Sequence, residues 1–307
     1  MTPEEFGYLR KMLKDRSGLN LGEDRQDFLE GRLKLLLNEF SCTSLSALAE
    51  ALKKPEAEYL RARVAQAVTV QESYFFRNKE PFQYFSEIML PALISARSAS
   101  RRIRIWCAAA ATGQEPYSLA MLIAERAREF DGFAVEIVAT DFSREALRKA
   151  RQGVYSQFEV QRGLPVSLLV KYFDKRGKGW ELNEKIRSMV EFSEHNLLLD
   201  APKSGVFDVI FCRNVLIYFD DATKRQVLAY LAGVLAADGY LMLGAAETAR
   251  GLSRDFVSAG EHCHGIYARA QGATVTTVAK AGDGIEPKEL SAEARELRRR
   301  ASGSESR

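Results

Sequence analysis

The sequence predicts an α/β protein in which a small helical domain precedes a parallel β-sheet that carries a small antiparallel β-insert. From about residue 101 onward, short apolar strands alternate with helical segments, which is typical of a parallel sheet covered on both faces. Residues 1–65 instead show only the helical spacing of apolar side chains, as in Phe6, Leu9 and Leu13. Residues 155–188 are more than a strand–helix connection requires, so we expect an insert there.

Each strand of the sheet is an apolar run that ends at small or polar residues. The expected strands are Ile103–Ala108, Val135–Thr140, Met189–Phe192, Phe207–Cys212 and Tyr240–Gly244. The expected helices are Glu115–Phe130, Ser143–Gln152 and Asp221–Leu235. Residues 256–268 are apolar enough to add antiparallel strands that close the sheet.

The remaining segments divide the chain further. Within residues 1–65 we expect a helix over Asp27–Phe40 and another that Ser44 caps. Residues 66–90 form a bridging segment, followed by the sheet domain over 91–270. The insert contains two short expected strands, Val170–Phe173 and Gly179–Leu182, and the tail 271–307 has too little apolar periodicity for a core, so we expect it to be disordered.

Composition excludes several classes of protein. The net charge of +3 gives no strong attraction to nucleic acid. The apolar runs are far shorter than the roughly 20 residues of a membrane span, and the acidic N-terminus lacks the apolar core of a signal peptide, so we expect a cytoplasmic protein without membrane insertion. The scattered cysteines predict neither disulfides nor a metal site, and His262-Cys263-His264 has no third partner in view, which favours packing over metal binding.

The loop after the first strand, Ala109 to Gly113, is the most informative part of the chain. Its small side chains allow a ligand to lie against the backbone, and the helix that follows offers free N–H groups. Glu115 places a carboxylate at the same point, which repels a phosphate but suits hydroxyls, an ammonium or a sulfonium. The loop therefore favours S-adenosylmethionine over a dinucleotide, and neither G-x-G-x-x-G nor a P-loop motif is present.

Polar residues follow the other strands at the edge where ligands of open α/β sheets bind. Asp141 follows the second strand, where a carboxylate can take ribose hydroxyls, although it can also cap the next helix. His195-Asn196-Leu197 follows the third strand, and Arg213-Asn214 follows the fourth. Arg213 can simply form an ion pair at the surface, and Asn214 can simply turn the chain. Next to the loop after the first strand, however, the two residues predict an active-site wall. We expect the rim of the site to include Thr112, Glu115, Asp141 and Asn214.

Three ordered blocks resemble one family. The blocks are Gln71-Glu72-Ser73-Tyr74-Phe75-Phe76-Arg77, Ala109-Ala110-Ala111-Thr112-Gly113-Gln114-Glu115-Pro116-Tyr117-Ser118 and Arg213-Asn214-Val215-Leu216-Ile217-Tyr218-Phe219-Asp220. They resemble the signature blocks of the CheR family, the bacterial chemotaxis receptor glutamate O-methyltransferases. The resemblance covers about residues 1–269 and implies a Rossmann-like class I S-adenosylmethionine-dependent methyltransferase fold.

The resemblance also implies roles for individual residues. It implies cofactor contacts at Gln71, Ser73, Arg77, Ala109, Glu115, Asp141, Asn196, Leu197, Arg213 and Asn214, and catalytic roles for Arg77, Arg213 and Tyr218. The family has Asn where Gln71 stands and Thr where Ser73 stands, and both differences keep the hydrogen-bonding type. The cofactor implied is S-adenosylmethionine, and the product is S-adenosylhomocysteine.

The implied substrate is the cytoplasmic helical bundle of a chemoreceptor, methylated on glutamates by a monomeric enzyme. Arg10, Lys14, Arg16 and Arg32 would give an acidic coiled coil a docking face. The insert has only a short loop around Tyr172–Trp180, so we expect no tether to a receptor peptide. Two alternatives stay open: a methyltransferase for another substrate, and a regulator that binds S-adenosylmethionine or S-adenosylhomocysteine without turnover. A nucleic-acid methyltransferase would have an N/D-P-P-[YF]-type loop, which the chain lacks at Arg213-Asn214.

Overall fold

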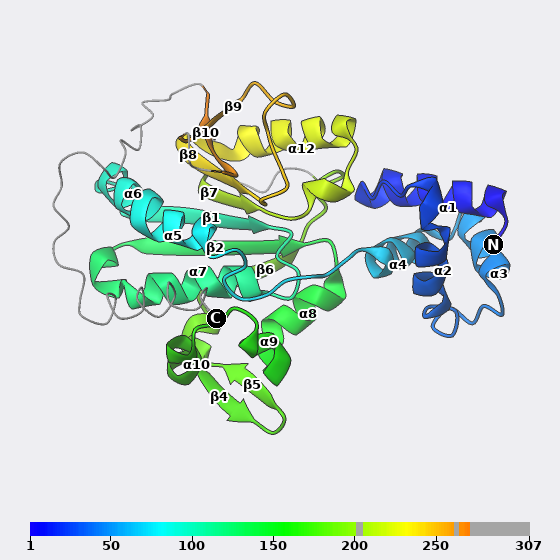
Figure 1. Ribbon diagram of the computed structural model, residues 1–307, viewed down its shortest axis with the longest axis horizontal. Helices are drawn as coiled ribbons and strands as arrows, with labels where there is room; N and C mark the ends of the chain where they lie inside the picture. Colours follow the sequence, from blue (N-terminus) through cyan, green and yellow to red (C-terminus); the bar gives the residue numbers. More distant parts are fainter. Residues whose placement is uncertain (201–204, 261–263, 271–307) are drawn as a thin grey trace, which may run out of the picture. The chain divides into compact units, whose positions relative to one another are not determined.

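The computed structural model describes residues 1–200, 205–260 and 264–270 (Figure 1). The predicted tail 271–307 and the pair His262-Cys263 lie outside this range. None of the helices in the described ranges has both the length and the apolar character that crossing a bilayer requires.

The first 68 residues form helices with their own core. The helices are α1 (Pro3–Ser17), η1 (Glu23–Arg25), α2 (Gln26–Lys34), α3 (Leu45–Lys53) and α4 (Glu58–Val68). Thr2 begins α1 with a capping box, and Gly18 ends it in a left-handed conformation with φ of 72°. Leu9, Leu13 and Leu29 are at most 1% exposed and pack together in this core. The expected helix over residues 27–40 is wrong in its length, because α2 ends at Lys34 and turns follow.

The segment after α4 carries aromatic side chains into the core of the sheet. Residues 69–74 have no regular structure, and three short helices follow, α5 (Glu80–Tyr84), η2 (Phe85–Met89) and α6 (Leu90–Ala96). Phe75 is fully buried and Phe76 is 8% exposed, and both pack with sheet residues. The paired phenylalanines of the bridging segment are therefore core residues, and only the polar residues around them are available to a ligand.

The main sheet has seven strands in the order β6-β2-β1-β7-β8-β10-β9. The strands are β1 (Arg102–Ala108), β2 (Ala134–Asp141), β6 (Val190–Glu194), β7 (Phe207–Cys212), β8 (Leu235–Leu243), β9 (Phe256–Ser258) and β10 (Ile266–Arg269). The first five in the spatial order are parallel, while β10 pairs antiparallel with both β8 and β9. The predicted sheet with its antiparallel closing strands is thus confirmed.

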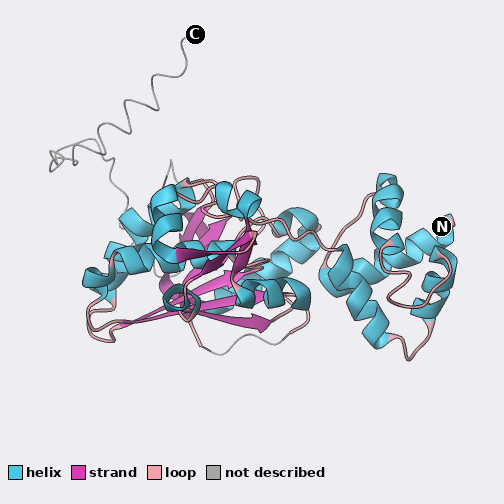
Figure 2. Ribbon diagram, turned by 90° about the horizontal axis from the view of Figure 1, so that it is seen from below, coloured by secondary structure: helices cyan, strands magenta, loops and turns pink. Residues whose placement is uncertain are grey.

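Helices cover both faces of this sheet (Figures 1 and 2). They are α7 (Gln114–Glu125) with η3 (Ala127–Phe130), α8 (Arg144–Gln152), and α12 (Asp221–Val234), which follows η4 (Leu216–Tyr218). Alternate residues of β1 belong to different cores: Ile105 and Cys107 pack in one cluster, Trp106 and Ala108 in the other. This alternation gives the sheet an apolar layer on each face. Because β1, β2 and β7 are parallel, their carboxyl ends lie together at one edge of the sheet, between these layers.

The insert forms a second, three-stranded antiparallel sheet, β3-β5-β4. Its elements are β3 (Val154–Ser156), α9 (Gln157–Gln161), α10 (Val166–Tyr172), β4 (Phe173–Arg176), β5 (Gly179–Leu182) and α11 (Glu184–Arg187). The expected strand Val170–Phe173 is wrong. Residues 166–172 are helical because Leu168 and Tyr172, four residues apart, bury one face of α10, and so short an apolar run does not distinguish the two structures.

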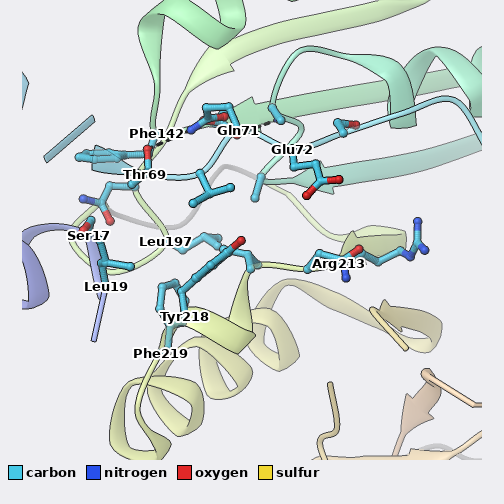
Figure 3. A pocket seen from close by; sticks show the side chains of 18 of the residues that line it. Ser17, Leu19, Thr69, Gln71, Glu72, Phe142, Leu197, Arg213, Tyr218 and Phe219 are labelled. Carbon is cyan, nitrogen blue, oxygen red and sulfur yellow. Dashed lines mark hydrogen bonds between the residues drawn. The ribbon is translucent and has the colours of Figure 1, made fainter. Parts of the chain in front are cut away.

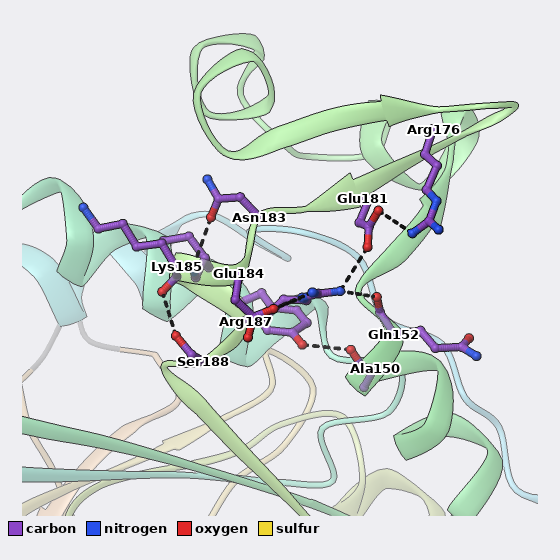
Figure 4. Close-up of polar contacts among 11 residues, drawn as sticks. Ala150, Gln152, Arg176, Glu181, Asn183, Glu184, Lys185, Arg187 and Ser188 are labelled. Atoms are coloured by element: carbon purple, nitrogen blue, oxygen red, sulfur yellow. Dashed lines mark hydrogen bonds and ion pairs between the residues drawn. The ribbon is translucent and has the colours of Figure 1, made fainter.

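Arg187 ties the insert to the main domain (Figure 4). Its Nη1 donates to the Gln152 carbonyl at the end of α8 at 3.1 Å and to Glu181 Oε1 of β5 at 3.2 Å. Arg176 contacts the second oxygen of Glu181 at 2.6 Å, and Asn183 caps α11. These polar contacts hold the insert at the side of α8 and do not extend to the carboxyl ends of the strands of the main sheet.

Candidate active site

A cavity of about 1000 Å³, counting its open mouth, lies at the carboxyl ends of β1, β2, β6 and β7 (Figure 3). The residues for which the resemblance implies a cofactor contact or a catalytic role all line it: Gln71, Ser73, Arg77, Ala109, Glu115, Asp141, Asn196, Leu197, Arg213, Asn214 and Tyr218. Thr112 does not line it, which corrects the expected rim. Its hydroxyl donates to Gln114 Oε1 at 2.8 Å instead.

The loop after β1 shows why small residues stand there. Ala109 and Ala111 both adopt left-handed backbone conformations, with φ of 80° and 47°. The amides of Ala109 and Ala110 donate to the Thr140 carbonyl at 2.9 and 2.8 Å, so the loop is fixed to the end of β2. A bulky or β-branched side chain is strained at such a φ, and Ala109 and Ala111 therefore leave open backbone on the cavity wall.

Asp141 connects the loops after β1 and β2. One carboxylate oxygen accepts the Ala111 amide and the other accepts the Ser143 amide, both at 2.8 Å. The N-cap of α8 is Ser143, whose hydroxyl accepts the Ala146 amide, so capping does not account for Asp141. Burial raises the pKa of Asp141 to about 6, although the backbone N–H donors offset part of the rise. The remaining lone pairs of a carboxylate in this position can accept hydroxyl donors from a ligand.

Glu115 and Arg213 form an ion pair in the wall of the cavity. The distance from Arg213 Nη1 to Glu115 Oε2 is 2.8 Å, and the side chains are 1% and 12% exposed, respectively. Burial raises the pKa of Glu115, and the neighbouring guanidinium offsets part of that rise. Glu115 thus brings a buried negative charge to the start of α7, as the sequence predicts.

Arg213 also fixes the bridging segment. Its Nη2 donates to the Arg77 carbonyl at 2.9 Å and lies 3.3 Å from Asn78 Oδ1, while its buried Nε has no hydrogen-bond partner among the described residues. The segment it holds is strained, because Phe76, Asn78 and Lys79 all have positive φ angles, of 51°, 66° and 30°. Arg213 therefore supports the turn that carries Arg77.

Arg77 is the second arginine at the cavity, and its guanidinium makes fewer polar contacts than that of Arg213. Its Nη1 donates to the Glu72 carbonyl at 2.9 Å, and its guanidinium lies 5.3 Å from the centre of the Tyr74 ring. Within the described residues Arg77 forms no ion pair. The structure thus separates the two arginines: Arg213 is neutralised by Glu115, whereas Arg77 can still receive an anion.

Glu247 organises the wall after β7, and sequence reasoning missed it. Its carboxylate accepts the amides of Asn214 at 2.7 Å, Gly244 at 2.6 Å and Ile217 at 3.2 Å. Asn214 is held in a left-handed conformation with φ of 59°. No motif marks Glu247, since it stands outside the three blocks, and only its fold position brings it against them.

Asn196, after β6, and Tyr218, after β7, also line the cavity. Asn196 Nδ2 donates to the Arg16 carbonyl at 2.7 Å, and its Oδ1 accepts the Leu198 amide at 3.0 Å, so its side chain is engaged within the chain. The Tyr218 side chain points into the cavity (Figure 3), and burial raises the pKa of its phenol. Ser17, the last residue of α1, and Leu19, two residues later, also line the cavity, although no sequence motif assigns them to it.

Comparison with known proteins identifies the family of the chain. The model of the CheR methyltransferase all-alpha domain matches residues 4–67, and that of the CheR methyltransferase SAM binding domain matches residues 71–263. Similar proteins include chemotaxis protein methyltransferase 1 of Pseudomonas aeruginosa, at 40% identity over 81% of this chain and 91% of that protein, and chemotaxis protein methyltransferase Cher2 of Pseudomonas putida, at 37% over the same shares. The chemotaxis protein methyltransferase of Vibrio parahaemolyticus is 35% identical over 83% and 93%.

The cavity also fits the cofactor that these comparisons name. Two buried carboxylates, Asp141 and Glu115, suit the hydroxyls and positive charges of S-adenosylmethionine, and Leu19, Phe142 and Leu197 supply apolar wall. The unpartnered Arg213 Nε shows that the wall still has a donor to satisfy. With S-adenosylmethionine as its cofactor, the chain belongs to the CheR methyltransferase family.

Proposed function

We propose that this chain transfers a methyl group from S-adenosylmethionine to glutamate carboxylates of chemoreceptor cytoplasmic domains, and that it does so in the cytoplasm as a monomer. One observation carries the proposal: Arg77, which forms no ion pair with any described residue, and the phenol of Tyr218 line the same cavity as the cofactor carboxylates. The names of the relatives as chemotaxis protein methyltransferases support it.

In this proposal the two buried carboxylates hold the cofactor. Asp141 accepts ribose hydroxyls beside the backbone of Ala109 and Ala111, and Glu115, which bonds Arg213 through Oε2, presents its other oxygen as an acceptor to the ammonium of the amino-acid part. Gln71, Ser73, Asn196, Leu197 and Asn214 complete the cofactor wall. When bound, S-adenosylmethionine supplies an electrophilic methyl group on a sulfonium.

The residues of the chain then have to orient the substrate and need not activate it. A glutamate side chain has an unperturbed pKa of about 4.3 and is already a carboxylate at neutral pH, so no general base is required. Arg77 attracts this anion, and the phenol of Tyr218, whose pKa is raised by burial, stays protonated and can donate to it. Positioning of this kind can lower a barrier by about 7–11 kcal/mol.

Three of the four cations proposed for the docking face of the helical domain already have partners within the chain. Lys14 contacts Asp220 at 2.6 Å, Arg16 pairs with Glu58, and Arg10 donates to the Leu21 carbonyl at 2.8 Å. Arg32 forms no ion pair within the described residues and lies 5.7 Å from the Phe28 ring centre. Arg32→Glu is thus the cleaner docking variant. It should raise the KM for receptor without changing S-adenosylhomocysteine affinity, and an unchanged KM would exclude Arg32 from docking.

Transfer of a labelled methyl group tests the function. The protein is incubated with methyl-labelled S-adenosylmethionine and membranes that contain a chemoreceptor, and base treatment should release the label as methanol, as expected for a glutamyl ester. Label that enters another molecule, or resists base, would indicate a methyltransferase with a different substrate. Binding of S-adenosylhomocysteine without transfer to any receptor would indicate a regulator without turnover.

A further inference from the structure

We infer that residues 17–20, the last residue of α1 and the turn that follows it (together called the end of α1), are a functional part of the active site, because they form one wall of the cofactor cavity and position Tyr218. Ser17 and Leu19 line the cavity, and Leu19 is only 6% exposed (Figure 3). These residues belong to none of the three sequence blocks. The inference rests on the proposed placement of S-adenosylmethionine in this cavity.

The first support is a backbone hydrogen bond to Tyr218. The Asn20 amide donates to the Tyr218 carbonyl at 2.8 Å. Tyr218 ends η4, a 3₁₀-helix of three residues, and so short an element has few hydrogen bonds of its own. Two residues on, Asp220 contacts Lys14 of α1 at 2.6 Å, and this contact lowers the pKa of Asp220. The turn that carries the tyrosine is therefore held by α1 on its C-terminal side.

The second support is a tie to the loop after β6. The last carbonyls of a helix have no partner within the helix, and the Arg16 carbonyl accepts a hydrogen bond from Asn196 Nδ2 at 2.7 Å. The end of α1 thus connects the loop that follows β6 to the loop that follows β7. These loops supply Asn196, Leu197 and Tyr218 to the cavity.

The third support is a glycine that the packing requires. Gly18 has φ of 72° and ends α1. A Cβ added there would lie 2.7 Å from the Phe219 ring and 2.9 Å from Leu198 Cδ1. Phe219 and Leu198 both line the cavity. Even one added methyl group at Gly18 would therefore displace cavity walls.

Binding of S-adenosylhomocysteine to the full chain tests the wall. Gly18→Ala is compared by calorimetry with Gly177→Ala in the β4–β5 hairpin, where φ is 59° and an added Cβ meets nothing within 4 Å. Both substitutions strain a left-handed position, but only the first disturbs the cavity. We expect the Kd of Gly18→Ala to rise at least about tenfold, a loss of about 1.4 kcal/mol, and that of Gly177→Ala to stay within about twofold of the original.

Turnover tests the positioning of Tyr218. Asn20→Pro removes the N–H that reaches the Tyr218 carbonyl. We expect kcat for methyl transfer to fall at least about tenfold while the Kd for S-adenosylhomocysteine changes less than about threefold. Thermal unfolding verifies that each variant is folded. Should one fail to fold, Lys14→Met, at a side chain that is 46% exposed, breaks the contact to Asp220 with less disturbance and should also lower kcat.

Asp141→Asn separates this inference from the proposed function. If it leaves the S-adenosylhomocysteine Kd unchanged, the cofactor is not in this cavity and the proposed site is wrong. If it weakens binding while folded Gly18→Ala and Asn20→Pro match the original protein in both Kd and kcat, the cofactor site stands and the role of α1 is overturned.

Discussion

Arg213 Nη1 and Glu115 Oε2 lie 2.8 Å apart in a wall where the arginine side chain is 1% exposed. The pair joins the end of β7 to the start of α7. Because the same guanidinium also donates to the Arg77 carbonyl, it connects three segments that are distant in sequence. Arg213 thus supports the wall, whereas Arg77 forms no ion pair with any described residue and, in the proposed function, attracts the substrate carboxylate.

Removing one member of this pair should destabilise the protein strongly. Arg213→Met leaves the buried Glu115 carboxylate without its partner, and such a change costs about 3–5 kcal/mol. The double variant Arg213→Met/Glu115→Gln removes both charges and should be more stable than Arg213→Met alone. Urea unfolding of both variants measures the difference. A double variant that is no more stable than the single one would show that the unpaired charge of Glu115 is not the main cause of the loss in stability.

The two arginines should also differ in kinetics. In Arg77→Met the fold keeps the Arg213 contacts to Glu115 and to the Arg77 carbonyl, since the latter is backbone. We expect kcat/KM for the receptor to fall by about 10²-fold, with a change of less than about 1 kcal/mol in the free energy of unfolding. Lys34→Met, at an exposed cation of α2, controls for the loss of one positive charge. Equal losses in both variants would exclude a specific contact between Arg77 and the substrate carboxylate.

Asp141 should make cofactor binding depend on pH. Burial raises its pKa to about 6 in the free protein, and a protonated carboxyl accepts ligand hydroxyls less well. We expect the affinity for S-adenosylhomocysteine to weaken as the pH falls from 7 to about 5, because this interval includes the pKa of Asp141. Calorimetry at several pH values, with Asp141→Asn as the comparison, measures it. The variant should bind more weakly at pH 7 and lose most of the pH dependence.

The same carboxyl should affect stability in the opposite sense. Its folded pKa of about 6 lies above the unfolded value of about 3.9, so the folded protein binds more protons between these values. Its contribution to the free energy of unfolding is therefore greatest below about pH 4 and is lost as pH rises through about 6. The difference between the original protein and Asp141→Asn isolates this term from the other carboxylates. A difference that does not vary between pH 4 and 7 would contradict the raised pKa.

Glu247 should prove essential although no motif includes it. In Glu247→Gln one acceptor oxygen becomes an amide donor that faces a backbone N–H, and an unsatisfied buried donor costs about 1–3 kcal/mol. Since the carboxylate holds Asn214 and Ile217, we expect kcat to fall by about tenfold or more. Glu136→Gln is the matched control, because Glu136 is a half-exposed carboxylate of β2 that contacts Arg102 and Arg104 of β1. Similar activities for the two variants would contradict the role of Glu247.

The sequence predicted the sheet well because its signals are local. Strands such as Phe207–Cys212 are continuous apolar runs, and the expected bounds of that strand agree with β7. The insert was harder, because the apolar run at Val170 fits a helix as well as a strand. The sequence also predicted that Asp141 and Glu115 lie at one edge of the sheet, because the carboxyl ends of parallel strands meet there.

What the sequence could not show depends on long-range contacts. The left-handed conformations of Ala109 and Ala111 have no signature in residue type, because tertiary contacts impose them, whereas asparagine, the residue at position 214, adopts this conformation more readily. Nor does any spacing place Glu247 against Asn214 or the end of α1 against Tyr218, since these partners are 33 residues or more apart. Prediction therefore missed Glu247 and the end of α1, which support the site through contacts between residues distant in sequence.

Tyr218 gives the sharpest test of orientation without acid–base catalysis. Burial raises the pKa of its phenol, so the hydroxyl stays protonated through the neutral range, and the substrate carboxylate needs no base. Tyr218→Phe removes one hydrogen-bond donor and keeps the ring that lines the cavity. We expect kcat to fall about 10- to 100-fold, and the Kd for S-adenosylhomocysteine to change less than about threefold. Between pH 7 and 9 the remaining kcat should keep the pH profile of the original protein, since no group essential for proton transfer has been lost. If turnover were unchanged while cofactor affinity collapsed, Tyr218 would be a cofactor residue, and the methyl acceptor would have to be oriented by Arg77 alone.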